Sequence, residues 1–281
     1  MKNAFHNNYH KENDNYKDAY NNQPDIIVDY KGIIIPLLAN AEIGKQKIVL
    51  LTTGAFNPIH RMHLEILNIA YKYLLSLNDY NVLCAFISPS ADCYVQYKRP
   101  PNFPFPLRCE MILTSIKQFY EEKKGKEKDM IKIYLNKWEG SHSYFIDFPE
   151  VISEIQKELN KIDDNIKLLY VCGIDHFIKC FYSFDRNVIA IYREPYKINE
   201  ADYRFKNNKK KLIFIIKDEN TAPFSSTSIK DSYEKNDLDS IKQCTFPGVY
   251  ETIVDYLDKM NSVKHKEEKH ENSLNNKNEG F

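Results

Sequence analysis

The sequence has no excess of charge of either sign. Lys plus Arg and Asp plus Glu each number 39 in a chain of 281 residues, so the formal net charge at pH 7 is zero. A balanced chain has no bulk electrostatic attraction to nucleic acid or to an acidic membrane surface. We therefore expect no nucleic-acid partner, and any anion that the protein binds must be held at a local site.

The cysteines lack the spacings of a redox or zinc motif. The chain has six, and no two of them form a Cys-x-x-Cys pair or stand with histidines at zinc-ligand spacing. Several lie in apolar runs, which is typical of reduced thiols, so a reducing compartment is favoured. The sequence predicts no metal site built from protein side chains alone.

Long apolar runs are also absent. Residues 1–22 are polar and rich in Asn, Tyr and His, without the apolar stretch of a signal peptide. No run approaches the roughly 20 apolar residues needed to span a bilayer. We expect a soluble intracellular protein in the cytoplasm or the nucleus, with no membrane partner.

Composition divides the chain into a domain and two tails. Residues 1–24 have many Asn, Lys and Asp and few aliphatic side chains, and residues 261–281 mix Lys, Glu, His and Asn. Such segments bury too little apolar surface to fold, so both are predicted to be disordered. Residues 25–260 are predicted to form the domain. Its first part, 25–40, carries the apolar run Ile33–Leu38 and is expected either to add an edge strand or to pack on the core.

Short apolar runs alternate with amphipathic stretches along the domain. The pattern predicts strands at 47–53, 81–87, 131–135, 166–172, 187–192 and 212–216, and helices at 64–75, 107–119, 144–159 and 249–260. This alternation predicts an α/β fold, a Rossmann-like parallel sheet with helices on both faces. Ligands of such sheets bind at the carboxyl ends of the strands, near the point where the strand order reverses.

A turn with two histidines follows the first predicted strand. It reads Gly54-Ala55-Phe56-Asn57-Pro58-Ile59-His60-Arg61-Met62-His63. Gly54 permits a tight turn beside a ligand, and the helix that follows offers free N–H groups to a phosphate. His60 and His63 share one face, so both imidazoles can donate to one phosphate and stabilise charge in a transition state. The plain alternative is two surface histidines after an ordinary loop, but the position after the first strand favours the phosphate site.

Other polar or aromatic motifs follow later strands. They are Ser88-Pro89-Ser90-Ala91-Asp92, Lys98-Arg99, Trp138-Glu139-Gly140-Ser141, Cys172-Gly173-Ile174-Asp175, Arg193, and Ser225-Ser226-Thr227-Ser228-Ile229-Lys230. Four of them have a plain structural explanation as well. Lys98 and Arg99 can be solvated loop cations, Trp138 can be a core residue, and the Asp and Ser/Thr motifs can be helix caps.

In their order, these motifs resemble those of the nucleotidyltransferase superfamily with a His/Thr-x-Gly-His element. In particular they resemble the eukaryotic-type nicotinamide/nicotinate mononucleotide adenylyltransferases, over roughly residues 46–260. The Phe-Asn-Pro turn, Met62 and the Trp-Glu pair are similar to that branch. Lys230 stands where the family usually has Arg, and it keeps the charge without the bidentate geometry.

The resemblance implies a role for each motif. His63, His60 and Lys230 are the expected catalytic residues, with the histidines at the α-phosphate of ATP and Lys230 at the leaving pyrophosphate. Further contacts to ATP or its phosphates are expected from Gly54, Ala55, Phe56, Lys98, Arg99, Gly173, Asp175, Arg193, Ser226, Thr227, Ser228 and Ile229. Contacts to the mononucleotide are expected from Asn57, Ser88, Ser141 and Trp138, the last stacked on the pyridine ring.

One stretch departs from the family. The segment between Asp175 and Arg193 is shorter than in typical eukaryotic members, which carry a second tryptophan against the pyridine ring. Phe181, Tyr182 or Phe184 can substitute for it. This departure puts affinity or substrate choice in question.

The implied reaction joins ATP to nicotinamide or nicotinate mononucleotide, forming NAD or its deamido form and pyrophosphate. Mg²⁺ would bind mainly through the ATP phosphates, and a homo-oligomer is possible. Two alternatives stay open. One is an adenylyl- or cytidylyltransferase for another phosphorylated metabolite, against which Trp138 argues. The other is a degenerate nucleotide-binding protein without activity, to which Lys230 and the shortened stretch lend weight.

Overall fold

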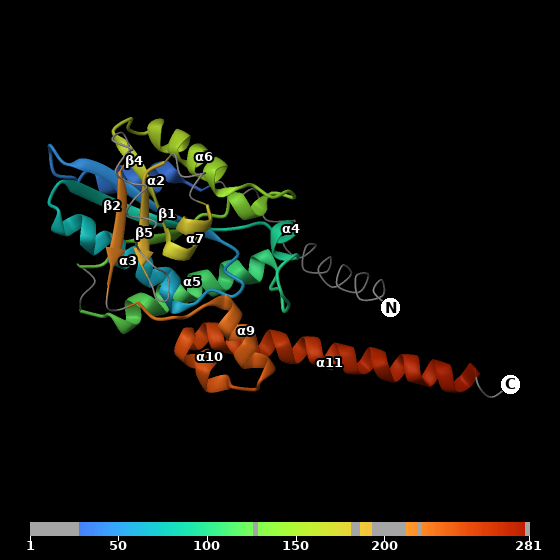
Figure 1. Cartoon of the computed structure of the whole chain (residues 1–281). Coiled ribbons are helices and arrows are strands. Elements are labelled where there is room, and N and C mark those ends of the chain that lie inside the picture. Colours follow the sequence, from blue (N-terminus) through green and yellow to red (C-terminus); the bar gives the residue numbers. More distant parts are fainter. Residues whose placement is uncertain (1–27, 126–128, 181–185, 193–211, 219–220, 279–281) are drawn as a thin grey trace.

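A parallel sheet lies at the centre of the structure, a computed structural model that describes residues 28–125, 129–180, 186–192, 212–218 and 221–278, with side chains described up to residue 262. Six strands pair in the order β3-β2-β1-β4-β5-β6, and every pair is parallel (Figure 1). The strands are β1 Gln46–Gly54, β2 Tyr80–Pro89, β3 Ile133–Leu135, β4 Ile166–Gly173, β5 Val188–Tyr192 and β6 Ile213–Lys217. The predicted Rossmann-like α/β fold is confirmed.

Helices cover both faces of the sheet. The α-helices are α2 Tyr30–Leu38, α3 Arg61–Ser76, α4 Asp92–Val95, α5 Phe105–Glu122, α6 Phe148–Asn160, α7 Ile174–Lys179, α9 Ser226–Glu234, α10 Leu238–Cys244 and α11 Pro247–Asn278, and η2 Glu139–Ser141 is a 3₁₀ turn. Helices α3, α5, α9, α10 and α11 share one core with the sheet, and α2, α6 and α7 share the other. The long helices of the prediction are present, but the short α4, η2, α7 and α10 were not predicted from periodicity.

Alternation along each strand divides the apolar residues between the two cores. In β1, Ile48 and Leu50 enter the core with α3 and α5, whereas Val49 and Leu51 enter the core with α6. All four are fully buried. A strand covered on both faces reads as a continuous apolar run, and this is why the strands were visible in the sequence.

The segment before β1 forms a helix and not an edge strand. In α2, the Asp29 side chain caps the first turn by accepting a hydrogen bond from the Gly32 N–H at 2.8 Å. Ile34 is fully buried in the core that contains α6. The expectation that this segment packs on the core is confirmed, and the edge-strand alternative is wrong because the cap and the buried Ile34 favour a helix.

The end of the chain also differs from the expectation of a disordered tail at 261–281. Helix α11 continues to Asn278 and extends away from the sheet (Figure 1). The residues from 249 to 278 include no Pro or Gly, so no residue stops a helix once α11 has begun at Pro247. Residues 1–24 lie outside the described part of the chain.

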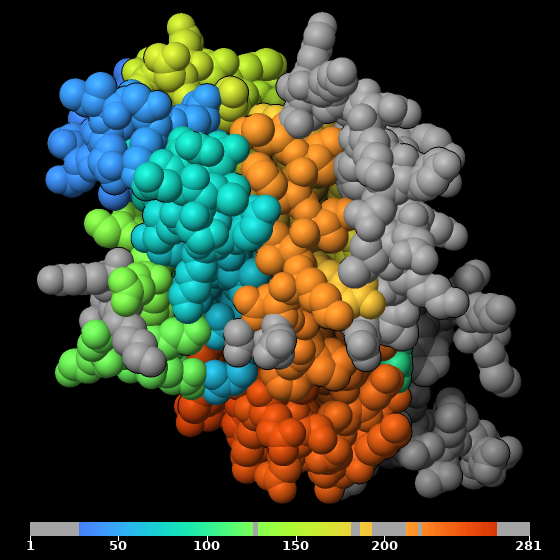
Figure 2. All heavy atoms as spheres, turned by 60° about the vertical axis from the view of Figure 1, so that its left-hand side comes forward, coloured from blue at the N-terminus to red at the C-terminus, as the bar shows by residue number. Residues whose placement is uncertain are grey.

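Segments far apart in the sequence meet on the face with α3. Figure 2 shows β6, in orange, against α3, in teal, with the C-terminal helices below them. The rings of Tyr73 on α3 and Phe214 on β6 lie edge to face with centroids 5.6 Å apart. This packing brings the chain that follows β6 back to the amino end of α3.

Candidate active site

The strand order reverses between β1 and β4, so the crevice that binds ligands in such sheets lies at their carboxyl ends. Strand β1 ends at Gly54 and leads through the histidine turn into α3. Strand β4 ends at Gly173, which is the N-cap residue of α7. Two of the predicted motifs therefore stand side by side at the expected edge of the sheet.

The two histidines form a stacked pair at the start of α3. His60 is the N-cap residue, and its backbone N–H donates to Nδ1 of His63 at 3.1 Å. The ring centroids are 3.6 Å apart, and the Phe56 ring meets His63 edge to face at 4.8 Å. His60 is buried and His63 half-buried. Because Nδ1 of His63 accepts this bond, its neutral ring carries the proton on Nε2 and offers a hydrogen-bond donor there.

The unusual backbone in this turn is at Phe56 and not at Gly54. Phe56 has a φ of 43°, in the left-handed region. A Cβ at Gly54 would lie 3.6 Å from the Phe56 ring, which is ordinary contact. Gly54 therefore has no strained conformation of its own, and the tight turn beside a ligand that it permits stays a prediction. A close approach by a ligand is the remaining reason for a glycine there.

The Ser/Thr motif lies against the histidine turn. Ser226 Oγ donates to the carbonyl oxygen of Pro58 at 2.8 Å, and the Ala222 N–H donates to Sδ of Met62 at 3.3 Å. Ser225 caps α9 by accepting from the Ser228 N–H at 3.0 Å. The amino ends of α3 and α9 thus meet.

Residues of the α9 motif differ in what they can offer a ligand. Thr227 is exposed, and Ser226 is half-buried. The Ser228 hydroxyl is used within the cap, where it donates to the Ser225 carbonyl at 2.8 Å. The Ile229 side chain is buried in the core, and its backbone N–H donates to the Ser225 carbonyl oxygen at 3.2 Å, so Ile229 supports the first turn of α9.

Three cations gather where the segment after α4 crosses α9. Lys230 is 5% exposed, and its ammonium donates to the carbonyl oxygen of Arg99. Burial, together with the positive charges of Arg99 and Lys98, lowers the pKa of Lys230 to about 8. The Arg99 guanidinium forms ion pairs with Asp231 and Glu234. The Lys98 ammonium lies over the Tyr94 ring and donates a hydrogen bond to its hydroxyl. A negative ligand beside Lys230 would relieve the repulsion among these cations.

Two residues predicted to contact the mononucleotide have side chains that hydrogen-bond to other parts of the protein. Asn57 is 2% exposed, donates to Asn102 Oδ1 at 2.7 Å and accepts from the Phe103 N–H at 2.9 Å. Ser88 is fully buried and donates to Glu139 at 2.8 Å. Both side chains hold loops of the site in place.

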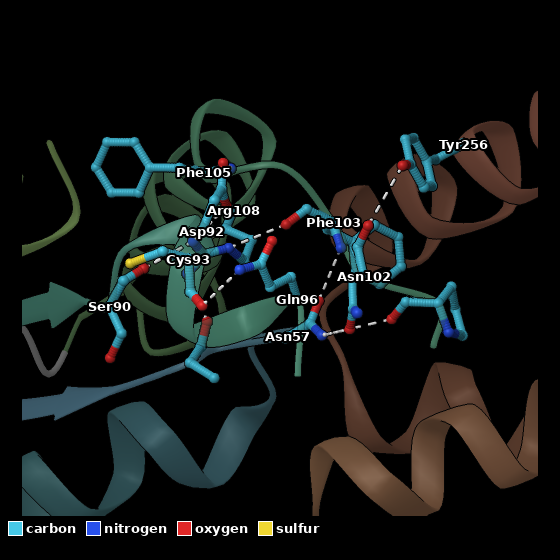
Figure 3. Close-up of polar contacts among 12 residues, drawn as sticks. Asn57, Ser90, Asp92, Cys93, Gln96, Asn102, Phe103, Phe105, Arg108 and Tyr256 are labelled. Carbon is cyan, nitrogen blue, oxygen red and sulfur yellow. Dashed lines mark hydrogen bonds and ion pairs between the residues drawn. The ribbon is translucent and has the colours of Figure 1, made fainter. Parts of the chain in front are cut away.

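Arg108 joins most of these loops and was not predicted as a site residue. It is fully buried at the start of α5. Its guanidinium donates to the carbonyl oxygens of Phe103 (3.0 Å), Ala55 (2.7 Å) and Ser90 (2.7 Å), and to Asp92 Oδ1 at 2.9 Å (Figure 3). One side chain therefore fixes the histidine turn, the end of β2 and the segment before α5. An arginine at a helix start gives no sign of such partners in the sequence.

Trp138 stands just before the 3₁₀ turn η2. It is half-buried, and its ring meets His142 edge to face with centroids 4.8 Å apart. Its carbonyl oxygen accepts from the exposed Ser141 hydroxyl at 2.9 Å and lies 2.7 Å from Nδ1 of His142. Trp138 is therefore neither fully in the core nor free in solvent, and its turn is held by its own neighbours.

Glu139 is a second residue that the sequence reasoning did not select. It is the first residue of η2, is 2% exposed, and its carboxylate accepts from Ser88 near the end of β2. Burial raises the pKa of its carboxyl to about 7, against the lowering effect of hydrogen bonds from Ser90 and Ser88 and of the Arg108 charge. A carboxyl with this pKa changes protonation near neutral pH.

The β4 motif places a carboxylate at the other side of the crevice. Asp175 lies in the first turn of α7 and is half-buried. Cys172, at the end of β4, is fully enclosed, and burial raises the pKa of its thiol well above the usual value. Arg193 and the aromatic candidates at 181, 182 and 184 lie outside the described residues.

Neither a membrane-spanning helix nor a cluster of metal-ligating side chains occurs among the described residues. None of the helices in that part of the chain has the length and apolar character needed to cross a membrane. In the same residues, no group of three or more His, Cys, Asp and Glu side chains is placed to hold a metal ion.

Comparison with known proteins gives a family match that spans the site. The profile of the cytidylyltransferase-like family matches residues 51–232, from the histidine turn to α9. A curated bovine (Bos taurus) protein, nicotinamide/nicotinic acid mononucleotide adenylyltransferase 1, is 42% identical over 50 residues. That match spans 18% of this chain and 18% of the relative.

Two solved structures are similar in fold. Both are of Plasmodium falciparum nicotinic acid mononucleotide adenylyltransferase, one complexed with APC and one with NaAD. Each aligns with a TM-score of 0.55 over 75% of this chain and 96% of the other, at 21% and 20% identity respectively. At this identity the likeness establishes the fold.

Proposed function

Since the chain belongs to the cytidylyltransferase-like family, we propose that it transfers the adenylyl group of ATP to nicotinate or nicotinamide mononucleotide. The products are the dinucleotide, NAD or its deamido form, and pyrophosphate. The names of the bovine relative and of the two Plasmodium structures support this choice of acceptor. We place the reaction inside the cell, in the cytoplasm or the nucleus.

The chemistry requires positioning more than proton transfer. A phosphate oxygen of the mononucleotide attacks the α-phosphorus of ATP in line, and the bond from that phosphorus to the bridging oxygen of pyrophosphate breaks. The nucleophile is already an anion, so no general base and no serine or cysteine nucleophile is needed. The protein has to align the two phosphates and stabilise the charge that develops on the transferring group and the leaving group.

The histidine turn supplies the donors for the α-phosphate. With Nδ1 of His63 occupied by the His60 N–H, Nε2 of His63 is the donor that meets the phosphate. His60 backs that ring and holds its orientation. Backbone groups of Gly54, Ala55 and Phe56 border the same space.

The amino end of α9 binds the leaving pyrophosphate. The backbone N–H groups of Ser226 and Thr227, with the exposed Thr227 hydroxyl, form the start of the helix, where anions are favoured. The N–H groups of Ser228 and Ile229 donate to Ser225 and support this first turn. Lys230 adds charge from the next turn of the same face. Lys98 and Arg99 contribute positive potential from the neighbouring segment.

The remaining predicted residues serve the mononucleotide and the ribose. Trp138 offers an aromatic face to the electron-poor pyridine ring, and Ser141 lies on the same turn. Gly173 and Asp175 border the nucleotide from β4, where the carboxylate accepts from ribose hydroxyls. Asn57 and Ser88 act by holding loops, because their polar atoms are bonded to the protein.

Magnesium enters with the substrate, as MgATP. The ion prefers phosphate and water oxygens and is commonly held with few protein ligands. ATP and the mononucleotide are the partners of this proposal.

One observation supports the proposal most directly. The 2.8 Å hydrogen bond from Ser226 to the Pro58 carbonyl joins two motifs that are 168 residues apart in the sequence. It sets the stacked histidines beside the start of α9, as a triphosphate bound across both would require.

The test is an assay of the full chain with MgATP and each mononucleotide, in which dinucleotide is separated by chromatography and pyrophosphate is measured. We expect dinucleotide with at least one acceptor. Replacing ATP by CTP tests the alternative within the family, and release of pyrophosphate only with another phosphorylated acceptor would support that alternative. Binding of MgATP without any turnover would indicate a non-enzymatic member.

His63→Ala tests the mechanism. Loss of one donor to the transferring phosphate should lower kcat by about 10²-fold or more, while the unfolding temperature stays close to that of the wild type. Lys45→Ala, beside the opposite end of β1, is the control and should keep full activity. Wild-type turnover in the His63 variant would refute the assignment.

A further inference from the structure

The segment after α4 and helix α9 hold each other on two sides. On the inner side, the Lys230 ammonium donates to the Arg99 carbonyl oxygen. On the outer side, the Arg99 guanidinium donates to Asp231 and, at 2.5 Å, to Glu234. Asp231 and Glu234 are three residues apart and share one face of α9, so one forked guanidinium reaches both.

This arrangement is connected to the histidine turn. Lys230 follows Ser226 by four residues and Thr227 by three, so the three lie on one face of α9. That face meets the turn through the Ser226–Pro58 hydrogen bond. The segment that carries Arg99 is fixed to the same turn, because Asn57 donates to Asn102 at 2.7 Å.

Two positive and two negative side chains surround Lys230 and act on it differently. Lys98 and Arg99 face it with positive charge from the segment after α4, and both lower its pKa. Asp231 and Glu234 lie on its own helix and are paired with Arg99. The two acids hold the guanidinium on the outer side and offset its charge.

We propose that Arg99, Asp231 and Glu234 form a clip that positions the Lys230 ammonium for the polyphosphate of a nucleotide and sets how strongly it binds. Arg99 is then a positioning residue that acts through Lys230. This differs from the direct phosphate contact expected from the sequence. The inference rests on the proposed function for its ligand, and MgATP is the probe.

The experiment measures the dissociation constant of MgATP by calorimetry at pH 7 and pH 9 with the full chain. With a pKa of about 8, the charged fraction of Lys230 falls from about 0.9 to about 0.1, so wild-type binding should weaken by up to about tenfold. Lys230→Met should bind weakly at both pH values, with most of this dependence lost.

Two variants break the same ion pairs but change the charge in opposite directions. Arg99→Met removes a positive charge, so Lys230 stays protonated to higher pH and the weakening between pH 7 and pH 9 becomes smaller than in the wild type. The double variant Asp231→Asn with Glu234→Gln leaves the Arg99 charge without its partners, so the weakening becomes larger. If the clip only held the two segments together, both variants would change the pH dependence of MgATP binding in the same direction.

Glu154→Gln, which breaks an exposed pair with Lys157 on the remote helix α6, is the control and should match the wild type. Opposite shifts in the two clip variants support the inference. Shifts in the same direction, or no shift, overturn it. If the wild type binds MgATP without pH dependence, only the clip proposal is refuted. If the wild type binds no MgATP, the proposed function is refuted as well.

Discussion

Replacing Arg108 by Leu should destabilise the protein more than any other single change considered for the site. The variant leaves the buried carbonyl oxygens of Phe103 and Ser90 and the half-buried one of Ala55 without their donor, and Asp92 without its cation. Each unsatisfied buried acceptor costs about 1–3 kcal/mol, and losing the ion pair with Asp92, whose side chain is 43% exposed, adds about 1 kcal/mol or less. These estimates overlap, and we expect a loss of about 5 kcal/mol.

That loss is large compared with the stability of a typical domain, about 5–15 kcal/mol. At about 2–4 °C per kcal/mol for a chain of this size, the unfolding temperature should fall by roughly 10–20 °C. Arg108→Lys keeps the charge but cannot reach all four acceptors, so its loss should be about half as large. Urea unfolding followed by circular dichroism gives the free energies directly.

The matched control is Arg61→Leu. Arg61 also donates to a backbone carbonyl, that of Thr245, and pairs with Glu122, but its side chain is 27% exposed. Its replacement should cost only about 1–2 kcal/mol. If Arg108→Leu lost no more than this control, the reasoning that a buried guanidinium holds three loops of the site together would be refuted.

Two further predictions concern the turn behind Trp138. A Cβ at Gly140 would lie 1.9 Å from the Phe105 ring and 2.5 Å from the Pro89 carbonyl oxygen, so Gly140→Ala should cost about 1–3 kcal/mol of stability and weaken mononucleotide binding. The control is Gly54→Ala, whose nearest contact is at 3.6 Å and which should fold normally. Equal stability of the two variants would contradict the tight packing at Gly140. The pKa of Glu139 rises from 4.5 to about 7 on folding, so its contribution to stability is complete below pH 4.5 and is lost as pH rises through 7. Between these limits Glu139→Gln should therefore gain up to about 3 kcal/mol relative to wild type, and an unchanged difference in urea unfolding between pH 5 and pH 8 would argue against a buried, protonated carboxyl.

The strands were predictable because a parallel strand covered on both faces needs an apolar residue at nearly every position. The run from Ile48 to Leu51 carries that signal without help from distant residues. Helix boundaries were less accurate. The helix expected from residue 144 begins at Phe148, since Asp147 caps it by accepting from the Phe148 N–H at 2.9 Å.

Some residues of the candidate site were predictable from the sequence, and others were assigned the wrong role. The histidine turn and the Ser/Thr motif were visible because a phosphate site at a helix start needs particular residue types close together in sequence. Asn57 and Ser88 were assigned to the ligand, although their side chains bond to Asn102 and Glu139. Polar residues next to a site give the same sequence signal whether they face the ligand or support a loop.

By itself, the sequence determined the order of strands and helices, the α/β class and the local motifs at the strand ends. Those properties depend on residues within a few positions of one another. Only the tertiary structure decided that α9 lies on the histidine turn, that Arg108 joins three loops, and that Arg99 turns toward α9. Each of these contacts depends on where the sheet order brings distant segments together, and a hydrogen-bond donor carries no mark in the sequence of which distant acceptor it will meet.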